Sequence, residues 1–149
     1  MATTTVSVTR TAAQLRLAIT RTARRLRQEA GEELSPSQAA ALATIDRHGP
    51  LTPSELAVRE RIQRPTATRV IARLEETGLV DRTQDPADRR SFVVALTPAG
   101  RQLLARVRTR KDAYLARRLR DLDATDRATL ARAAEILDGL LERRDGDPA

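Results

Sequence analysis

The sequence predicts a mostly helical protein with a small β-hairpin, arranged as a winged helix-turn-helix with flanking helices at both ends. Two observations carry this α+β fold class. Three short amphipathic patterns, each opened by a helix-start signal, follow one another over residues 35–77. The apolar period then changes from helical to alternating over residues 79–96, which is typical of two strands joined by a turn.

The first expected helix covers residues 10–30, where Leu15, Ile19, Leu26 and Ala30 recur at helical spacing. Gly31 follows and can end it, because glycine readily adopts the left-handed conformation at a helix C-terminus.

The next two helices begin with the same device. Ser35-Pro36-Ser37-Gln38 and Thr52-Pro53-Ser54-Glu55 both read as capping boxes, in which the first side chain caps the helix and the fourth returns the hydrogen bond. The helix from residue 35 ends at His48-Gly49-Pro50. A third short helix has Pro65 in its first turn and ends at Thr77-Gly78.

Two β-rich runs, residues 79–84 and 91–96, flank a charged turn over residues 85–90 and predict the hairpin. Two more helices follow, one after Thr97-Pro98 and one starting near Asp123. Together these elements divide the chain into residues 10–34, 35–100 and 101–143.

Composition narrows the function classes. The 149 residues include 27 basic and 20 acidic residues, a net charge of +7, and Lys111 is the single lysine. The chain has no cysteine and one histidine, His48, which excludes thiolate metal sites and argues against a histidine-based triad. No signal peptide or membrane span is apparent. We therefore expect a soluble cytoplasmic protein without metal or cofactor, and the excess charge indicates a polyanionic partner.

The third short helix offers the first candidate DNA contacts. Ala67, Val70, Ile71 and Leu74 form its apolar stripe, which leaves a polar outer face consisting of Arg64, Thr66, Thr68, Arg69 and Arg73. A helix fits the major groove, where an arginine can bind a guanine edge or a phosphate. The alternative is that Arg69 and Arg73 pair with Glu75 or Glu76 on an ordinary solvated surface.

The turn of the hairpin offers the second set of contacts, Asp88, Arg89 and Arg90. An extended loop bearing arginine suits the narrow minor groove of A·T-rich DNA. Asp88 would orient one of these arginines and stiffen the tip. The alternative here is a surface hairpin with an ordinary salt bridge.

These segments resemble the MarR family of bacterial transcriptional regulators. The resemblance rests on residues 51–57, 69–80 and 85–97, of which the hairpin pattern Asp88-Arg89-Arg90-Ser91 followed by alternating apolar residues is the most specific. It implies that Thr66, Thr68 and Arg69 face the major groove and that Arg89 and Arg90 lie near the minor groove, with Asp88 bracing the arginine.

The resemblance also implies a two-fold homodimer built by residues 10–34 and 101–143, and therefore a palindromic operator. The alternative is a monomeric helical bundle. Many relatives release DNA when a small aromatic or phenolic molecule binds. We therefore expect a repressor of its own or neighbouring genes relieved by such a ligand, although the sequence identifies no ligand-binding residue.

Two other functions stay open. One is a winged-helix module that binds protein instead of DNA. The other, a small enzyme, is less favoured because the sequence has no glycine-rich phosphate loop and no Gly-x-Ser-x-Gly motif.

Overall fold

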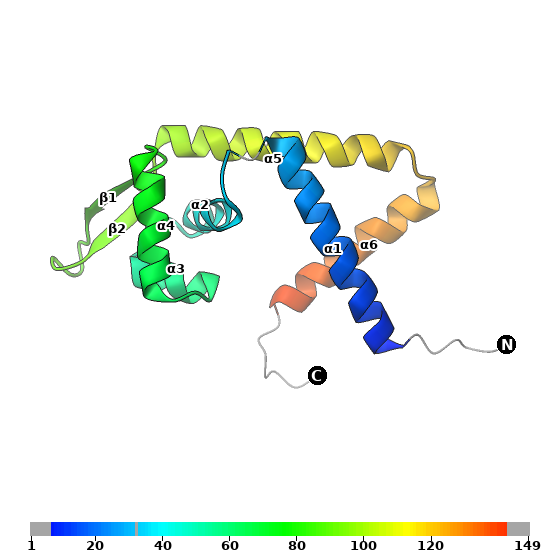
Figure 1. The fold of residues 1–149 in the computed structure, drawn as a ribbon, viewed down its shortest axis with the longest axis horizontal. Coiled ribbons are helices and arrows are strands. Elements are labelled where there is room, and N and C mark those ends of the chain that lie inside the picture. Colours follow the sequence, from blue (N-terminus) through cyan, green and yellow to red (C-terminus); the bar gives the residue numbers. More distant parts are fainter. Residues whose placement is uncertain (1–6, 32, 143–149) are drawn as a thin grey trace. The chain divides into compact units, whose positions relative to one another are not determined.

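A computed structural model describes residues 7–31 and 33–142. Along the chain the elements are α1 (Val8–Ala30), α2 (Pro36–His48), α3 (Pro53–Glu60), α4 (Arg64–Glu76), β1 (Val80–Gln84), β2 (Phe92–Leu96), α5 (Pro98–Arg120) and α6 (Ala124–Glu142) (Figure 1). The chain divides into two compact units between Lys111 and Asp112. The predicted fold class, mostly helical with one antiparallel hairpin, is confirmed.

Both predicted capping boxes are present. The Ser35 hydroxyl accepts a hydrogen bond from the backbone N–H of Gln38, and the Gln38 side chain accepts one from the N–H of Ser35. Thr52 and Glu55 make the same reciprocal pair at the start of α3. Each box satisfies two backbone donors that a helix start leaves unpaired, so these boundaries are set by local sequence.

The core of the first unit lies where α2, α3 and α4 pack on one another and on the hairpin. The largest side chains that are almost completely buried there are Leu42, Ile45, Leu56, Ile71, Leu74, Val80 and Val94. The α4 stripe predicted from the sequence, Ala67, Val70, Ile71 and Leu74, is buried as a whole. One side of α4 is therefore fixed by apolar packing, and its other side faces outward.

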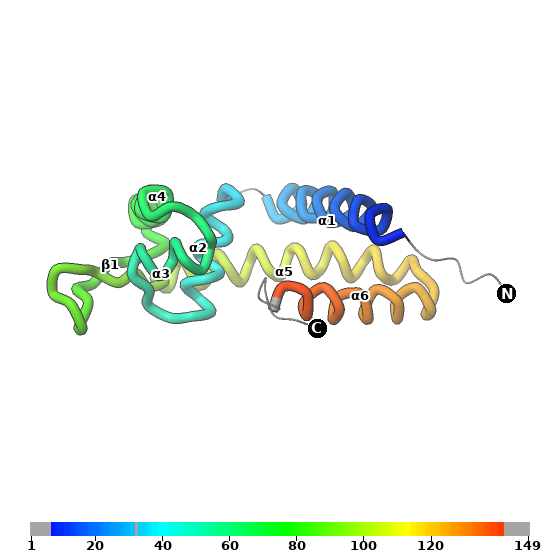
Figure 2. The backbone as a smooth tube through the Cα atoms, turned by 90° about the horizontal axis from the view of Figure 1, so that it is seen from below, coloured from blue at the N-terminus to red at the C-terminus, as the bar shows by residue number. Residues whose placement is uncertain are grey.

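The hairpin is antiparallel, with Val80 opposite Leu96 and Gln84 opposite Phe92. Each strand begins one residue later than the sequence predicted. Leu51 adds a one-residue third strand by exchanging two backbone hydrogen bonds with Val94, at 3.1 and 2.8 Å. Figures 1 and 2 show from two directions that the rest of the hairpin extends beyond the helices.

The start of α5 is joined tightly to the turn between α4 and β1. The Thr97 hydroxyl donates to the carbonyl of Gly78 at 2.7 Å and accepts from the N–H of Gly100 at 3.0 Å. Gly100 lies so close to this turn that an added Cβ would be 2.1 Å from the carbonyl oxygen of Leu79. The end of α4, the base of the hairpin and the start of α5 therefore form one rigid junction.

The flanking helices expose apolar side chains. On α1, Leu15, Leu17 and Ile19 are 39–50% exposed. In the second unit, the α6 side chains Leu130, Ile136, Leu140 and Leu141 are 48–84% exposed. Within the part of the chain that the structure describes, no helix is both long and apolar enough to cross a membrane.

Candidate nucleic-acid interface

The outer face of α4 carries most of the predicted helix contacts. Arg64, Thr68, Arg69 and Arg73 are exposed, whereas Thr66 is half-buried at the edge of the apolar stripe. Thr68 donates its hydroxyl proton to the carbonyl of Arg64 at 3.0 Å, so in this conformation the hydroxyl can only accept a further bond. The groups on this face that can donate to an anion are therefore mainly guanidinium groups.

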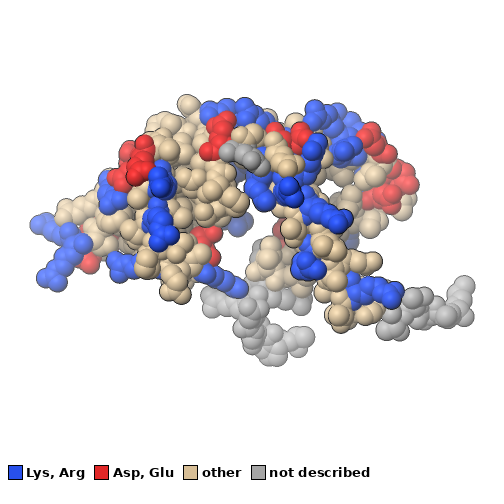
Figure 3. Space-filling view, in the orientation of Figure 1, with Lys and Arg blue, Asp and Glu red and all other residues tan. Residues whose placement is uncertain are grey.

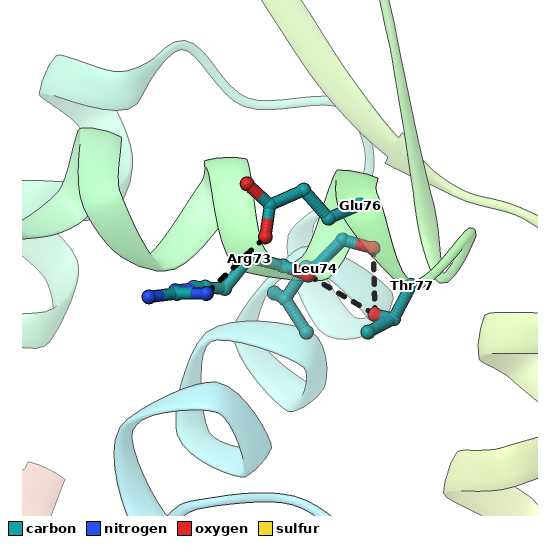
Figure 4. Close-up of polar contacts among 4 residues, drawn as sticks. All are labelled: Arg73, Leu74, Glu76 and Thr77. Atoms are coloured by element: carbon teal, nitrogen blue, oxygen red, sulfur yellow. Dashed lines mark hydrogen bonds and ion pairs between the residues drawn. The ribbon is translucent and has the colours of Figure 1, made fainter.

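The arginines of α4 differ in their partners. Among the described residues, Arg64 and Arg69 have no ion pair or side-chain hydrogen bond. Arg73 points toward Glu76 in Figure 4, with 3.4 Å between Arg73 Nη1 and Glu76 Oε2. The same view shows the Thr77 hydroxyl donating to the carbonyls of Arg73 and Leu74, which closes the end of the helix.

If the outer face of α4 were an ordinary solvated surface, Arg69 and Arg73 would both pair with Glu75 or Glu76. Among the described residues, only Arg73 makes such a pair, with Glu76. The side chains of Arg73 and Glu76 are 70% and 64% exposed. Exposed ion pairs of this kind contribute about 0–1 kcal/mol to stability. A phosphate can therefore replace Glu76 as the partner of Arg73 with little loss of free energy.

The hairpin tip is held by its own hydrogen bonds. Asp85 Oδ1 accepts from the N–H of Ala87, and Asp88 Oδ1 accepts from the N–H of Arg90, both at 2.9 Å. The backbone N–H of Ser91 donates to the carbonyl of Asp88 at 3.0 Å. The Gln84 side chain also donates to the carbonyl of Arg89 at 3.0 Å. These bonds fix the backbone of the turn before any ligand is bound.

Arg89 and Arg90 are exposed on this ordered turn, and Figure 3 shows basic side chains gathered at the end of the hairpin. Asp88 contacts the backbone of Arg90 and, within the described ranges, forms no ion pair with either guanidinium. It therefore shapes the turn and leaves both guanidinium groups able to bind an external anion.

The structure adds residues that the sequence reasoning missed. A surface groove of about 290 Å³ between α2 and α4 is lined by Ser35, Ser37, Gln38, Arg69, Val70 and Arg73. The start of α2 therefore lies beside two of the predicted DNA-contacting arginines. A second addition is Arg82 on β1, which reaches Glu75 on α4. Neither juxtaposition has a local sequence signal, because each joins elements separated along the chain.

The two groups of arginines lie on one packed domain but on two different elements, a helix and an ordered hairpin. A helix has the width of the DNA major groove, and arginine on an extended loop fits the minor groove. Among residues 7–31 and 33–142, no group of three or more His, Asp or Glu side chains is placed to hold a metal ion. The exposed guanidinium groups of this surface can bind a polyanion.

Comparison with known proteins gives consistent results. Residues 34–92 match the model of the MarR family. The chain is 38% identical to an uncharacterised HTH-type transcriptional regulator of Mycobacterium bovis over 134 residues, which is 89% of this chain and 94% of that protein. It is 33% identical to the HTH-type transcriptional repressor MdtR of Bacillus subtilis over 109 residues, covering 68% of this chain and 70% of MdtR.

Solved structures show the same architecture. A transcriptional regulator protein from Pseudomonas aeruginosa superimposes with a TM-score of 0.80 at 36% identity, covering 94% of this chain and all of that one. Wild-type MarR from E. coli superimposes with a TM-score of 0.73 over 89% of this chain and 97% of its own, and at 22% identity this likeness shows the fold alone.

Proposed function

The chain belongs to the MarR family of transcriptional regulators, and from this premise we propose that it binds a specific double-stranded DNA sequence through α4 and the hairpin. In this proposal α4 lies in the major groove and the hairpin tip enters the adjacent minor groove. The observation that carries the proposal is two groups of exposed arginines on one packed domain, Arg64 and Arg69 on α4 and Arg89 and Arg90 on the hairpin, whose guanidinium groups have no partner among residues 7–31 and 33–142.

Each element has a separate task. Arg69 projects from the middle of the exposed α4 face and can bind a guanine edge or a phosphate, with Arg64, Thr66, Thr68 and Arg73 contacting the backbone or neighbouring bases. Arg89 and Arg90 are presented by a turn that Asp88 shapes, so little conformational entropy is lost when they enter a narrow groove.

The functional unit in this proposal is a homodimer. Residues 10–34 and 101–143 form the dimerisation region, and residues 35–100 form the DNA-binding domain. Support comes from the apolar side chains that α1 and α6 expose in a single chain, since a second copy would remove them from water. Two-fold symmetry would place two α4 helices about one turn of DNA apart and so favours a palindromic operator.

The regulator acts as a repressor of its own or neighbouring genes in this proposal, and a small aromatic or phenolic ligand relieves repression. MdtR, which matches more than two thirds of this chain, is named a repressor. A ligand that binds one spacing of the two α4 helices better than another would shift the population away from the DNA-bound form. Since bacterial chromosomal DNA lies in the cytoplasm, the protein would act there.

The test is a gel-shift titration on the DNA upstream of the protein's own gene. Arg69→Ala should weaken binding by roughly five- to 150-fold, as expected for loss of a bidentate base contact worth about 1–3 kcal/mol. Arg90→Ala should weaken binding and lower the salt dependence, because a positive charge that lies between the phosphates lining the minor groove is lost.

Arg132→Ala is the matched control. Arg132 is an exposed arginine that pairs with Glu135 on α6, in the other compact unit, so its loss changes the net charge by the same amount. We expect an affinity within about twofold of wild type. Equal losses for Arg69→Ala and Arg132→Ala, or wild-type binding that does not depend on salt, would favour the protein-binding module instead.

A further inference from the structure

We propose that Glu75, Arg82 and Phe92 act as a wing clamp, a set of positioning residues that fixes the angle between α4 and the hairpin so that both enter DNA together. The inference rests on the proposed function, because it concerns how the two contacting elements are held. The experiment distinguishes a clamp that does not position the hairpin from a hairpin tip that does not contact DNA.

The clamp joins three elements. Arg82 on β1 reaches the carboxylate of Glu75 on α4, with 2.6 Å from Nη2 and 2.9 Å from Nε to the same oxygen, Oε2. The guanidinium carbon of Arg82 lies 4.2 Å from the centre of the Phe92 ring on β2. One side chain is thus held both by an ion pair to the helix and by a cation–π contact to the opposite strand.

The strand register explains why this arginine faces the helix. Successive side chains of a strand alternate between faces, so Arg82 lies on the same face as Val80, which is completely buried. Arg82 is opposite Val94, and Phe92 is the diagonal neighbour on that face. A charged residue therefore continues the core-facing side of β1 just beyond the last buried residue of that strand.

Among the residues that the structure describes, the guanidinium group of Arg82 has two partners, whereas those of Arg89 and Arg90 have none. Its Nε and Nη2 both point to Glu75, and one face of its guanidinium covers Phe92. The side chains of Arg82 and Glu75 are 40% and 36% exposed, about half the exposure of the Arg73–Glu76 pair. We therefore assign Arg82 to holding the hairpin and not to contacting DNA.

The position of the clamp gives it leverage over the tip. Beyond the Leu51–Val94 bridge the hairpin is only two strands wide, and such a ribbon bends and twists readily. A strand rises about 3.3 Å per residue, so the turn begins roughly 10 Å past Arg82. A rotation of about 10° at the clamp moves the tip by about 2 Å, which is enough to break a hydrogen bond to DNA.

Glu75→Gln tests the clamp because charge and geometry predict opposite results. Removing an acidic group from a DNA-binding domain should, by charge alone, tighten binding. If the clamp positions the hairpin, Glu75→Gln should instead weaken operator binding by roughly three- to tenfold, since the ion pair that ties Arg82 to α4 is lost.

Glu76→Gln is the matched control on the next residue of the same helix. It makes the same change in charge, but Glu76 pairs with Arg73 on its own helix and does not reach the hairpin. Releasing Arg73 should leave binding unchanged or tighten it by up to about threefold. Arg82→Lys is a second clamp variant that keeps the positive charge and loses the planar fork, and it should weaken binding as Glu75→Gln does.

A double-mutant cycle with Arg89→Ala/Arg90→Ala distinguishes positioning from a general structural role. Operator affinities would be measured by fluorescence anisotropy, with thermal unfolding of every variant as the check on folding. If the clamp positions the hairpin tip, Glu75→Gln weakens operator binding when it is made in the wild-type protein. When it is made in Arg89→Ala/Arg90→Ala, it changes the operator affinity by less than about twofold, because the arginines that the clamp positions are absent.

Three results would overturn the proposal. Glu75→Gln could bind the operator as tightly as wild type or more tightly. Glu75→Gln could weaken operator binding by the same factor in the wild-type protein and in Arg89→Ala/Arg90→Ala. The contact of the hairpin tip with DNA would then stand, but the clamp would have a structural role only. Finally, Arg89→Ala/Arg90→Ala could bind like wild type, which would refute the minor-groove contact and with it any need to position the hairpin.

Discussion

The junction of α4, the hairpin and α5 can be tested by adding a single methyl group at Gly100. In Gly100→Ala the new Cβ would lie 2.1 Å from the carbonyl oxygen of Leu79 and 3.1 Å from its carbonyl carbon. Both atoms are backbone, so no side-chain rotation can relieve the clash. Either α5 or the turn after α4 must move, and the two hydrogen bonds that Thr97 makes to residues 78 and 79 would be strained.

The expected loss of stability follows from three contributions. Overpacking of this kind costs about 1–3 kcal/mol, and weakening the two hydrogen bonds adds about 1 kcal/mol. Alanine's higher helix propensity returns about 1 kcal/mol. The net destabilisation is therefore roughly 1–3 kcal/mol, which corresponds to a decrease in Tm of roughly 3–10 °C for a chain of this length.

Gly139→Ala is the matched control, because it makes the same chemical change within α6. An added Cβ at Gly139 meets no atom of the described residues within 4 Å, so only the propensity gain of up to about 1 kcal/mol remains and Tm should rise. Both variants would be followed by circular dichroism during heating, at one protein concentration. An unchanged or increased Tm for Gly100→Ala would refute the rigid junction.

Three further predictions concern the hairpin tip, a helix start and the assembly. Asp88→Ala should weaken operator binding in a gel shift, since it removes the acceptor for the Arg90 N–H. Asp88→Asn keeps that acceptor and should bind at least as tightly as wild type. Weak binding by both variants would refute the role of Asp88 in fixing the backbone of the turn. Thr52→Ala should lower the free energy of urea unfolding by about 1 kcal/mol through loss of the α3 cap, and no change would contradict that assignment. Ile136→Asp should yield monomers in analytical ultracentrifugation, because it places a charge among the exposed apolar side chains of α6. Ala131→Asp, on another side of α6, should leave the dimer intact. If Ile136→Asp is still a dimer, the face of α6 that carries Ile136 is not in the interface.

Much of this fold could be predicted from the sequence because its boundaries are encoded locally. The capping boxes at Ser35 and Thr52 each occupy four consecutive residues, and the buried α4 stripe follows from helical periodicity alone. The hairpin was predictable for the same reason, since its turn residues and alternating apolar positions are adjacent along the chain.

Contacts between elements were not predictable in this way. Arg73 and Arg82 both had acidic residues available on α4, and only the packing of β1 against the helix determines that Arg82 binds Glu75 while Arg73 binds Glu76. The same holds for Thr66, whose half-burial depends on the neighbours of α4. The sequence indicated that Asp88 would orient an arginine, whereas its acceptor role toward the backbone N–H of Arg90 required the geometry of the turn.

The central claim, that α4 and the hairpin tip occupy neighbouring grooves of one duplex, is tested most directly by hydroxyl-radical footprinting of the operator complex. For wild type we expect protection at two half-sites about one helical turn apart, with further protected minor-groove positions outside them. With the Arg89→Ala/Arg90→Ala variant, the protection of the outer minor-groove positions should disappear, while the protection of the two half-sites remains. An identical footprint for both proteins, or central protection lost together with the outer positions, would contradict the account.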